Sequence, residues 1–439
     1  MKVRPEPPTS TARHRVLMVS WEYPPVVVGG LGRHVHQLAE ALAAQGIEVT
    51  VLTRQPSGTD GSTHPTTDTV VNGVRVVAVA EDPPEFEFGV DMMAWTLAMG
   101  HGFIRAGLRH LGGADRWRPD VVHAHDWLVA HPAIALADFF DVPLIATLHA
   151  TEAGRHSGWV AGRMNRQVHS VEWWLANSAD ALITCSSSMR EEVSELFSTS
   201  GPGSDSLAPI TVIHNGIDLT AWEFADRPKR LGAPELLFAG RLEYEKGVQD
   251  VLEALPAIRR AHPGTRLTIA GEGTQLAWLT ELAAEYKVTR AVTFAGRQDH
   301  DGLVTLMQRC TAIVLPSRYE PFGIVALEAA ASGIPLITST AGGLGEAVHD
   351  GETGVTFAPA DINGLTHAVC ATLDDKHAAA ARARRARAVL TEEFTWPVIA
   401  ERTDAVYAVA QRREHRPLAR PEIPERPLPD RDPANPITA

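Results

Sequence analysis

The sequence predicts an α/β protein made of two doubly wound domains that face each other across a cleft. Three observations predict this fold class. Apolar, β-branched runs alternate with helical patterns along the chain, as parallel sheets covered by helices require. The alternation occurs twice, on either side of a turn signal at residues 214–218. The length of 439 residues favours two or three domains over one.

Apolar runs mark the expected strands of both domains. In the first half of the chain they occupy residues 15–21, 48–54, 74–80, 120–124, 143–149, 181–185 and 210–213. In the second half they occupy residues 235–239, 266–270, 291–295, 312–316, 335–338 and 354–357. Strands of this kind are buried on both faces of a parallel sheet, and ligands bind at their carboxyl ends. Surface loops are expected at the polar segments 55–72 and 198–207.

The turn between the two halves sets the expected domain boundaries. We expect a first domain over residues 14–216 and a second domain over residues 217–397. A last helical pattern over residues 398–413 is expected to pack back on the first domain. The two ends of the chain are rich in proline and polar side chains, which predicts a disordered lead-in and a disordered tail, residues 1–13 and 414–439.

Composition limits the classes of function. Hydrophobic residues make up 44% of the chain and charged residues 21%, which is ordinary for a soluble enzyme. The net charge of −13 argues against a mainly electrostatic grip on nucleic acid or anionic lipid. No apolar run is long enough to span a bilayer, so a cytoplasmic location is expected. Buried thiols in a reducing cytosol, rather than disulfides, are predicted for the three cysteines, Cys185, Cys310 and Cys370.

Two cations follow the expected strand 235–239. Arg241 and Lys246 lie five residues apart. A guanidinium binds two phosphate oxygens at once, and an ammonium supplies a point charge. Together they predict a site for a diphosphate, which they would stabilise as a leaving group. The alternative is a surface pair that meets Glu243 and Glu245.

Two carboxylates lie around a glycine turn further along the chain. Seven residues separate Glu320 from Glu328. Between them Phe322, Gly323 and Ile324 are expected to begin a helix, so that their amides point at the cleft. Carboxylates are suitable acceptors for the hydroxyls of a hexose or a ribose. The alternative, acids that balance the helix dipole, explains Glu320 better than Glu328.

A glycine loop follows the first expected strand. Gly29, Gly30 and Gly32 open a helical pattern, where backbone amides can approach an anion. A dinucleotide site is the obvious rival, but Val35 stands where its third glycine belongs, and Arg54 stands where an acid would hold a ribose. We therefore expect a phosphate contact and no nicotinamide cofactor.

Histidines lie at the ends of two further strands. His149 ends the expected strand 143–149, where an imidazole can contact a sugar hydroxyl or serve as a structural group. His123, His125 and Asp126 resemble a metal cluster. No third or fourth ligand set is apparent, so we expect a polar cleft edge and no metal site.

These motifs resemble those of the retaining GT-B glycosyltransferases of family 4. The resemblance covers about residues 14–413, and the combination of two cations with two spaced glutamates is specific to it. It implies the GT-B fold, in which two Rossmann-like domains face a central cleft. Four further segments resemble, more narrowly, the actinobacterial α-1,4-glucosyltransferases of glycogen and methylglucose lipopolysaccharide synthesis: residues 20–25, 29–32, 123–127 and 151–156.

The resemblance also implies a role for each part of the site. Arg241 and Lys246 would bind the donor diphosphate, Glu328 the nucleotide ribose, and Arg297 would lie near the base. The glycine loop would reach the donor phosphate. Glu320 and the amides at the helix start would hold the sugar and the phosphate. The transferred glucose would meet two residues of the first domain, His149 and Asp126.

The reaction implied by the resemblance is glucosyl transfer with retention. Glucose would pass from UDP-glucose or ADP-glucose to the non-reducing end of an α-1,4-glucan, without a metal or a cofactor. Glycogen synthases often carry a lysine before their glycine pair, whereas Val28 precedes Gly29 here, which leaves the donor nucleotide open. A mannosyltransferase with a lipid acceptor and a nucleotide-sugar epimerase are the alternatives.

Overall fold

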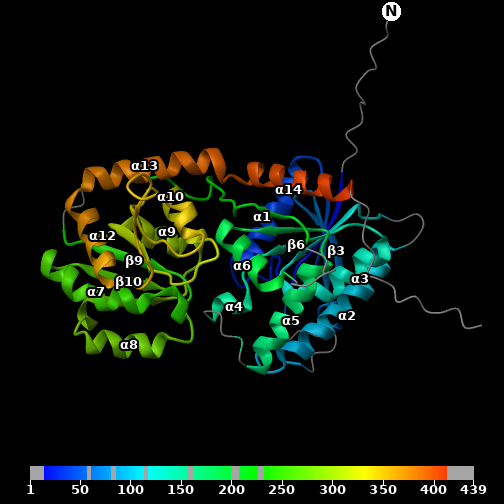
Figure 1. Cartoon of the computed structure of the whole chain (residues 1–439), viewed down its shortest axis with the longest axis horizontal. Helices are drawn as coiled ribbons and strands as arrows, with labels where there is room; N and C mark the ends of the chain where they lie inside the picture. Colours follow the sequence, from blue (N-terminus) through cyan, green and yellow to red (C-terminus); the bar gives the residue numbers. More distant parts are fainter. Residues whose placement is uncertain are drawn as a thin grey trace, which may run out of the picture.

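The computed structural model describes residues 14–56, 61–80, 86–112, 117–156, 160, 162–198, 207–225 and 232–412. They form two α/β domains, each built on one sheet with helices packed against it (Figure 1). The predicted fold class is therefore confirmed. The expected lead-in, the tail and most of the second polar loop lie outside the described residues.

The first sheet has eight strands in the order β3-β4-β2-β1-β5-β6-β7-β8, and all neighbours are parallel except β3 and β4. Its central strand β1 is buried on both faces, because Leu17 and Val19 enter one core while Val16 and Met18 enter another. The strands are β1 (Arg15–Val19), β2 (Glu48–Arg54), β3 (Thr67–Val71), β4 (Val74–Val79), β5 (Val121–His125), β6 (Leu144–Leu148), β7 (Ala181–Thr184) and β8 (Ile210–Val212).

Strand β3 corrects one prediction, because it lies within residues 55–72, which we expected to be a loop. Asn72 and Gly73 have φ angles of 50° and 83°. This two-residue turn folds β3 back against β4 in an antiparallel hairpin. All five residues of β3 are exposed, since the strand lies at the edge of the sheet. It therefore lacks the apolar pattern that marks the buried strands.

The second sheet has six strands in the order β11-β10-β9-β12-β13-β14, and all neighbours are parallel. Every predicted strand of both sheets is present, with ends shifted by at most two residues. The strands are β9 (Glu235–Ala239), β10 (Arg266–Ala270), β11 (Val292–Gly296), β12 (Ala312–Leu315), β13 (Leu336–Ser339) and β14 (Val355–Phe357).

Helices connect the strands of each sheet. In the first domain they are α1 (Gly30–Ala44), α2 (Met92–Leu111), η1 (Trp127–Val129), α3 (Ala130–Phe140), α4 (Glu152–Arg155), α5 (Arg163–Ser178) and α6 (Ser187–Phe197). In the second domain they are η2 (Tyr244–Lys246), α7 (Val248–Ala261), α8 (Leu276–Glu285), η3 (Thr289–Ala291), α9 (His300–Arg309), α10 (Ile324–Ala331), α11 (Leu344–Ala347), α12 (Ile362–Asp374) and α13 (Lys376–Glu393). Within the described ranges, no helix is both long and apolar enough to cross a membrane.

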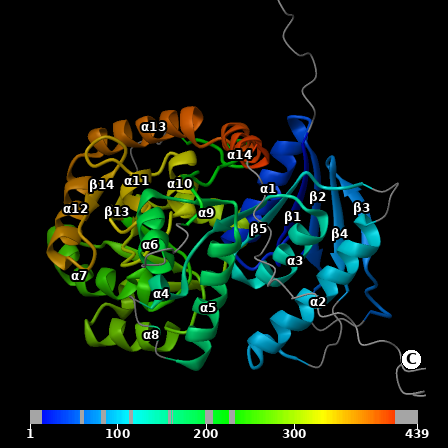
Figure 2. The same ribbon diagram turned by 45° about the vertical axis from the view of Figure 1, so that its right-hand side comes forward.

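The last helix, α14 (Trp396–Gln411), returns to the first domain. Both ribbon views show it beside α1, whereas α13 lies over the second domain (Figures 1 and 2). Ile399, Ala400 and Tyr407 of α14 belong to the same core as Met18 and Leu38. The end of the chain therefore completes the first domain, and this core would be left open without it.

The two domains contact each other directly. Glu346 of α11 accepts hydrogen bonds from the amides of Ser187 and Ser188, at 2.9 and 3.0 Å, at the start of α6 in the first domain. The hydroxyl of Tyr319 donates to Glu192 of α6 at 3.1 Å. A continuous apolar cluster also extends from the first domain into the second. The domains therefore meet in a closed arrangement.

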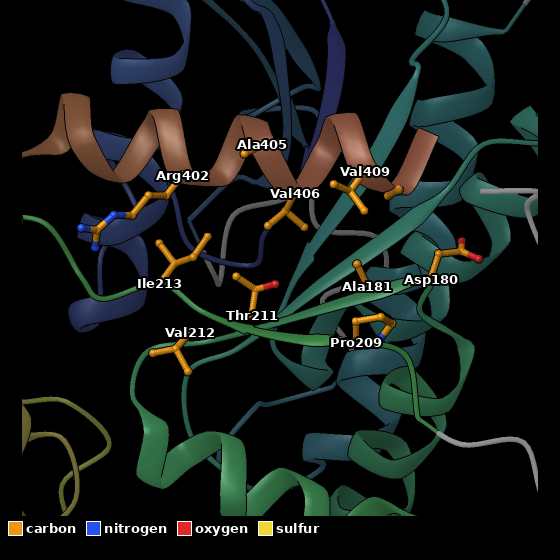
Figure 3. Close-up of a pocket in the computed structure, with 11 residues that line it drawn as sticks. Asp180, Ala181, Pro209, Thr211, Val212, Ile213, Arg402, Ala405, Val406 and Val409 are labelled. Atoms are coloured by element: carbon orange, nitrogen blue, oxygen red, sulfur yellow. The ribbon is translucent and has the colours of Figure 1, made fainter. Parts of the chain in front are cut away.

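A cavity of about 390 Å³ lies away from these contacts, between the edge strand β8 and α14 (Figure 3). Figure 3 shows Val406 and Val409 on the helix side, with Ala181 and Val212 on the sheet side. The lining is mainly apolar and contains none of the predicted site residues, so the candidate active site lies elsewhere.

Candidate active site

The predicted site residues follow the carboxyl ends of strands from both sheets. In the first domain, Gly29, Gly30 and Gly32 follow β1, Asp126 follows β5, and His149 follows β6. In the second domain, Arg241 and Lys246 follow β9, Arg297 follows β11, Glu320 follows β12, and Glu328 lies on α10. Strand ends of this kind form the ligand-binding edge of an α/β sheet.

Lys246 and Glu320 form an ion pair, with 2.8 Å between Nζ and Oε2. The Lys246 side chain is 15% exposed and the Glu320 side chain 17%. The hydroxyl of Ser317 donates to the same carboxylate oxygen at 3.2 Å. Because β9 and β12 are neighbours in the sheet, their loops bring these two predicted catalytic groups into direct contact, largely shielded from water.

A glycine is required directly after Lys246. Gly247 has a φ angle of 72°, a conformation that favours glycine. A Cβ at this position would lie 2.0 Å from the carbonyl oxygen of Pro316. The loop after β9 therefore passes too close to the end of β12 for any side chain, and this close approach positions Lys246 beside Glu320.

Two predicted cations are exposed. Arg241 is 62% exposed, and its Nη2 lies 3.2 Å from Oε1 of Glu245 on the same loop. For Arg241 this is the surface contact that the sequence allowed as an alternative, whereas Lys246 pairs with Glu320 instead. Arg297 is exposed after β11, the edge strand of the second sheet. A role for either residue at a ligand depends on reorientation of its side chain and stays a prediction.

Glu328 is held by a residue that the sequence analysis did not identify. The Nη1 of Arg33, on the first turn of α1, lies 2.5 Å from Oε1 of Glu328. The Glu328 side chain is 2% exposed, and its Oε2 is buried without a hydrogen-bond partner among the described residues. Burial raises the pKa of this carboxyl, and the charge of Arg33 opposes that shift. The ion pair joins the two domains across the cleft.

The start of α10 is built by one glycine turn. Gly323 has a φ angle of 95° and caps the helix, so α10 begins at Ile324 and Phe322 precedes it. The Phe322 ring is buried and stacks on His214 with 5.4 Å between ring centroids. Only the backbone of this segment is therefore available for a ligand near Phe322. The carbonyl oxygen of Glu320 accepts a hydrogen bond from the Gly343 amide at 3.0 Å, which holds the turn in place.

A buried acid shapes the glycine loop. The Oε2 of Glu22 accepts hydrogen bonds from the amides of Val28 and Gly29, at 2.7 and 2.9 Å. A Cβ at Gly32 would lie 2.9 Å from the same oxygen, so a side chain at this position would displace the carboxylate. The Gly29 amide is thus used inside the loop. Gly30 lies against Ile324 of the second domain, where a Cβ would come within 3.0 Å of the isoleucine side chain.

Asp126 and His149 are joined through the backbone. Asp126 has a φ angle of 62°, and its Oδ1 accepts a hydrogen bond from the His149 amide at 2.7 Å. Burial raises the pKa of Asp126 to about 6, although the charge of Arg155 lowers it. Burial also lowers the pKa of His149 to about 4, and Arg155 acts in the same direction. His149 is therefore a neutral imidazole near pH 7.

His149 is half-buried and belongs to a cluster of imidazoles that includes the buried His34 and His125. His125 Nδ1 lies 3.2 Å from His149 Nε2, and His34 Nδ1 lies 2.7 Å from Oδ1 of Asn215. One nitrogen from each of His34, His125 and His149 falls within 4.8 Å of the others, so these three groups could together hold a metal ion. The set differs from the one weighed in the sequence, because His123 instead contacts Tyr407 and Thr147, both at 2.7 Å.

Family comparisons match both halves of this architecture. Residues 28–221 match the family described as "Glycosyltransferase Family 4", and residues 222–389 match "Glycosyl transferases group 1". The chain belongs to these glycosyltransferases, and its two facing Rossmann-like domains have the GT-B fold. The boundary between the two matches lies a few residues beyond the predicted one at residue 216.

Individual relatives agree with this assignment. The chain is 63% identical to a protein named glycogen synthase from Mycobacterium tuberculosis, over 95% of this chain and 100% of the relative. Among solved structures, sucrose-phosphate synthase from Thermosynechococcus elongatus matches with a TM-score of 0.74 and 24% identity, over 90% of this chain and 99% of that one. The catalytic domain of starch synthase IV from Arabidopsis thaliana, bound to ADP and acarbose, matches with a TM-score of 0.70 and 18% identity, over 92% and 100%.

Proposed function

We propose that this protein is a retaining glucosyltransferase that moves glucose from a nucleoside diphosphate glucose to the non-reducing end of an α-1,4-glucan. The observation that carries the proposal is the 63% identity to a glycogen synthase over nearly the whole chain. The site geometry supports it, because cations and carboxylates suited to a sugar diphosphate meet in one cleft. UDP-glucose and ADP-glucose are both candidate donors.

The leaving group is the diphosphate of the donor. As the glycosidic bond to phosphate breaks, negative charge grows on the phosphate oxygens. Lys246, partly shielded from water beside Glu320, would stabilise that charge in a medium where electrostatic interactions are strong. Arg241 would add a second cation after leaving Glu245. No step of this scheme requires a metal or a cofactor.

Glucose would lie between the two domains. Glu320 would accept hydrogen bonds from sugar hydroxyls once Lys246 turns toward phosphate, and Glu328 would accept them from the ribose. The backbone amide of Ile324, at the start of α10, would face the phosphate or the sugar. On the opposite side, neutral His149 would contact a hydroxyl of the transferred glucose, with Asp126 fixing its backbone.

Retention of configuration follows from attack on the face that the phosphate leaves. The hydroxyl of the acceptor would approach on that face, and the departing phosphate oxygen would accept its proton. Closed domains keep bulk water from the reacting carbon and limit hydrolysis of the donor. The contacts of Glu346 with α6 support such closure.

The test is product analysis of the purified protein with UDP-glucose, ADP-glucose and GDP-mannose, each with and without a malto-oligosaccharide. We expect the oligosaccharide to grow by α-1,4-linked glucose, and the relative rates identify the donor. Methylated glucose oligosaccharides as acceptors test the narrower role in methylglucose lipopolysaccharide synthesis. Mannose transfer to lipid, or epimerised sugar without an acceptor, would replace the proposed function. A cytoplasmic location, where such donors are made, is part of the proposal.

A further inference from the structure

The ion pair between Arg33 and Glu328 joins two unlike environments. Arg33 is 51% exposed on the first turn of α1, whereas Glu328 is 2% exposed on α10 of the other domain. The two residues are 295 positions apart in sequence. Because they lie in different domains, their contact depends on the closed arrangement. A cation that water reaches therefore covers an acid that water does not reach.

In this arrangement neither oxygen of Glu328 is open to a ligand. Arg33 covers Oε1 at 2.5 Å, and Oε2 is buried without a partner among the described residues. The proposed function requires Glu328 to accept hydrogen bonds from a ribose diol. That contact requires Arg33 to leave Oε1.

A released Arg33 would remain where a diphosphate is expected. It follows the glycine loop directly, on a helix turn that carries no acidic residue and has the partial positive charge of a helix N-terminus. A guanidinium can bind two phosphate oxygens in a forked geometry. Lys246 has the same relation to Glu320, since it also covers an acid expected to meet the donor. Two cations and two acids thus neutralise each other in pairs, Arg33 with Glu328 between the domains and Lys246 with Glu320 within the second domain.

We propose that Arg33 is a donor-binding residue that exchanges partners, a proposal that rests on the proposed function. When the nucleotide binds, the ribose diol takes the place of the guanidinium on Glu328, and Arg33 moves to the diphosphate. A ligand with both parts compensates both groups of the broken ion pair. A nucleoside compensates only Glu328 and leaves Arg33 without an anion. The ion pair therefore selects for a complete nucleoside diphosphate over a nucleoside.

The exchange predicts opposite effects of one substitution, which calorimetric titration can measure. In the Arg33→Ala protein, affinity for UDP or ADP falls about tenfold or more, because a charged hydrogen-bonding partner is lost. Affinity for the matching nucleoside, uridine or adenosine, rises about threefold or more, because Glu328 is no longer covered. Arg33→Lys, which keeps the charge but not the fork, binds the diphosphate with an affinity between those of wild type and Arg33→Ala.

Arg75→Ala is the matched control. Arg75 also forms a short ion pair in the first domain, at 2.7 Å to Asp68, but this pair joins β4 to the edge strand β3, away from the candidate site. This variant should leave both affinities unchanged. The exchange would be overturned if Arg33→Ala lowered the affinities for nucleoside and diphosphate together, or left both unchanged. Either result would leave glucan elongation by the wild type intact. Wild-type protein that binds neither UDP nor ADP would overturn the proposed function as well.

Discussion

Replacing Lys246 by alanine is the sharpest test of the catalytic assignment. The ammonium lies 2.8 Å from Glu320 and is 15% exposed, so it acts in a partly desolvated site. Loss of one such group that stabilises charge in the transition state typically costs ~10²–10³-fold in kcat, or ~2.7–4 kcal/mol. We expect a loss in that range. The free energy of unfolding should fall by about 1–3 kcal/mol, because Glu320 loses its charged partner in a largely shielded position but keeps its hydrogen bond from Ser317.

The assay is release of nucleoside diphosphate at saturating donor and glucan, with thermal unfolding measured in parallel. Arg75→Ala again provides the control, because it removes an ion pair of similar length away from the cleft. A folded Lys246→Ala protein with kcat within tenfold of wild type would refute the reasoning. A raised KM with unchanged kcat would assign Lys246 to ground-state binding rather than to leaving-group stabilisation.

Three further predictions concern the loops and the buried acids. Gly247→Ala should lower both the thermal midpoint and kcat, because a Cβ would lie 2.0 Å from the Pro316 carbonyl oxygen and the strain of a positive φ costs about 1–3 kcal/mol. Burial raises the pKa of Asp126 to about 6. If catalysis needs the ionised carboxylate, kcat/KM should decline as the pH falls below that value. Asp126→Asn should lower the activity and remove this decline. Burial raises the pKa of Glu172 to about 8, so as the pH rises the unfolded chain loses this proton before the folded protein does. The free energy of unfolding should therefore decrease between about pH 5 and 8, by on the order of 1 kcal/mol per pH unit. Glu172→Gln should flatten this pH dependence in thermal unfolding.

Each of these has a clear contrary result. Normal turnover in Gly247→Ala would show that the loop can shift without displacing Lys246. An unchanged acid limb in Asp126→Asn would assign that limb to another group. An equal loss of stability between pH 6 and pH 8 in wild type and Glu172→Gln would show that Glu172 is not the titrating group, although its carboxylate is only 1% exposed.

Much of the fold is predictable because buried parallel strands have a strong local signature. In a run such as residues 235–239, the four residues after Glu235 are apolar and buried, as a strand in the interior of a parallel sheet requires. Strand β3 has no such signature. Its formation depends on the Asn72-Gly73 turn and on backbone pairing with β4, while all its side chains face water. Edge strands of this kind are specified by their neighbours rather than by their own composition.

The position of a candidate residue was predictable where it follows a strand of one sheet, and its partner was not predictable where the contact is made between the domains. Lys246 and Glu320 lie after neighbouring strands, so their contact follows from the order of the sheet. Arg33 meets Glu328 only because two domains meet, and no local pattern signals a partner 295 residues away. The role of Glu22 in the glycine loop was also missed. Its physical signal is an acid close in sequence to a glycine loop whose backbone amides need an acceptor. Arg241 shows the local alternative, an i to i+4 pair with Glu245.

The return of α14 to the first domain has a consequence for synthesis on the ribosome. The first domain lacks part of its core until this helix appears, about 180 residues after β8 ends. At ~5–20 residues per second, the delay is roughly 10–40 s. During that time the core that contains Met18 and Leu38 lacks the side chains that α14 contributes to it. Translation of the second domain therefore separates the synthesis of the two parts of one core in time, and the apolar face that α14 covers stays open until the helix is made.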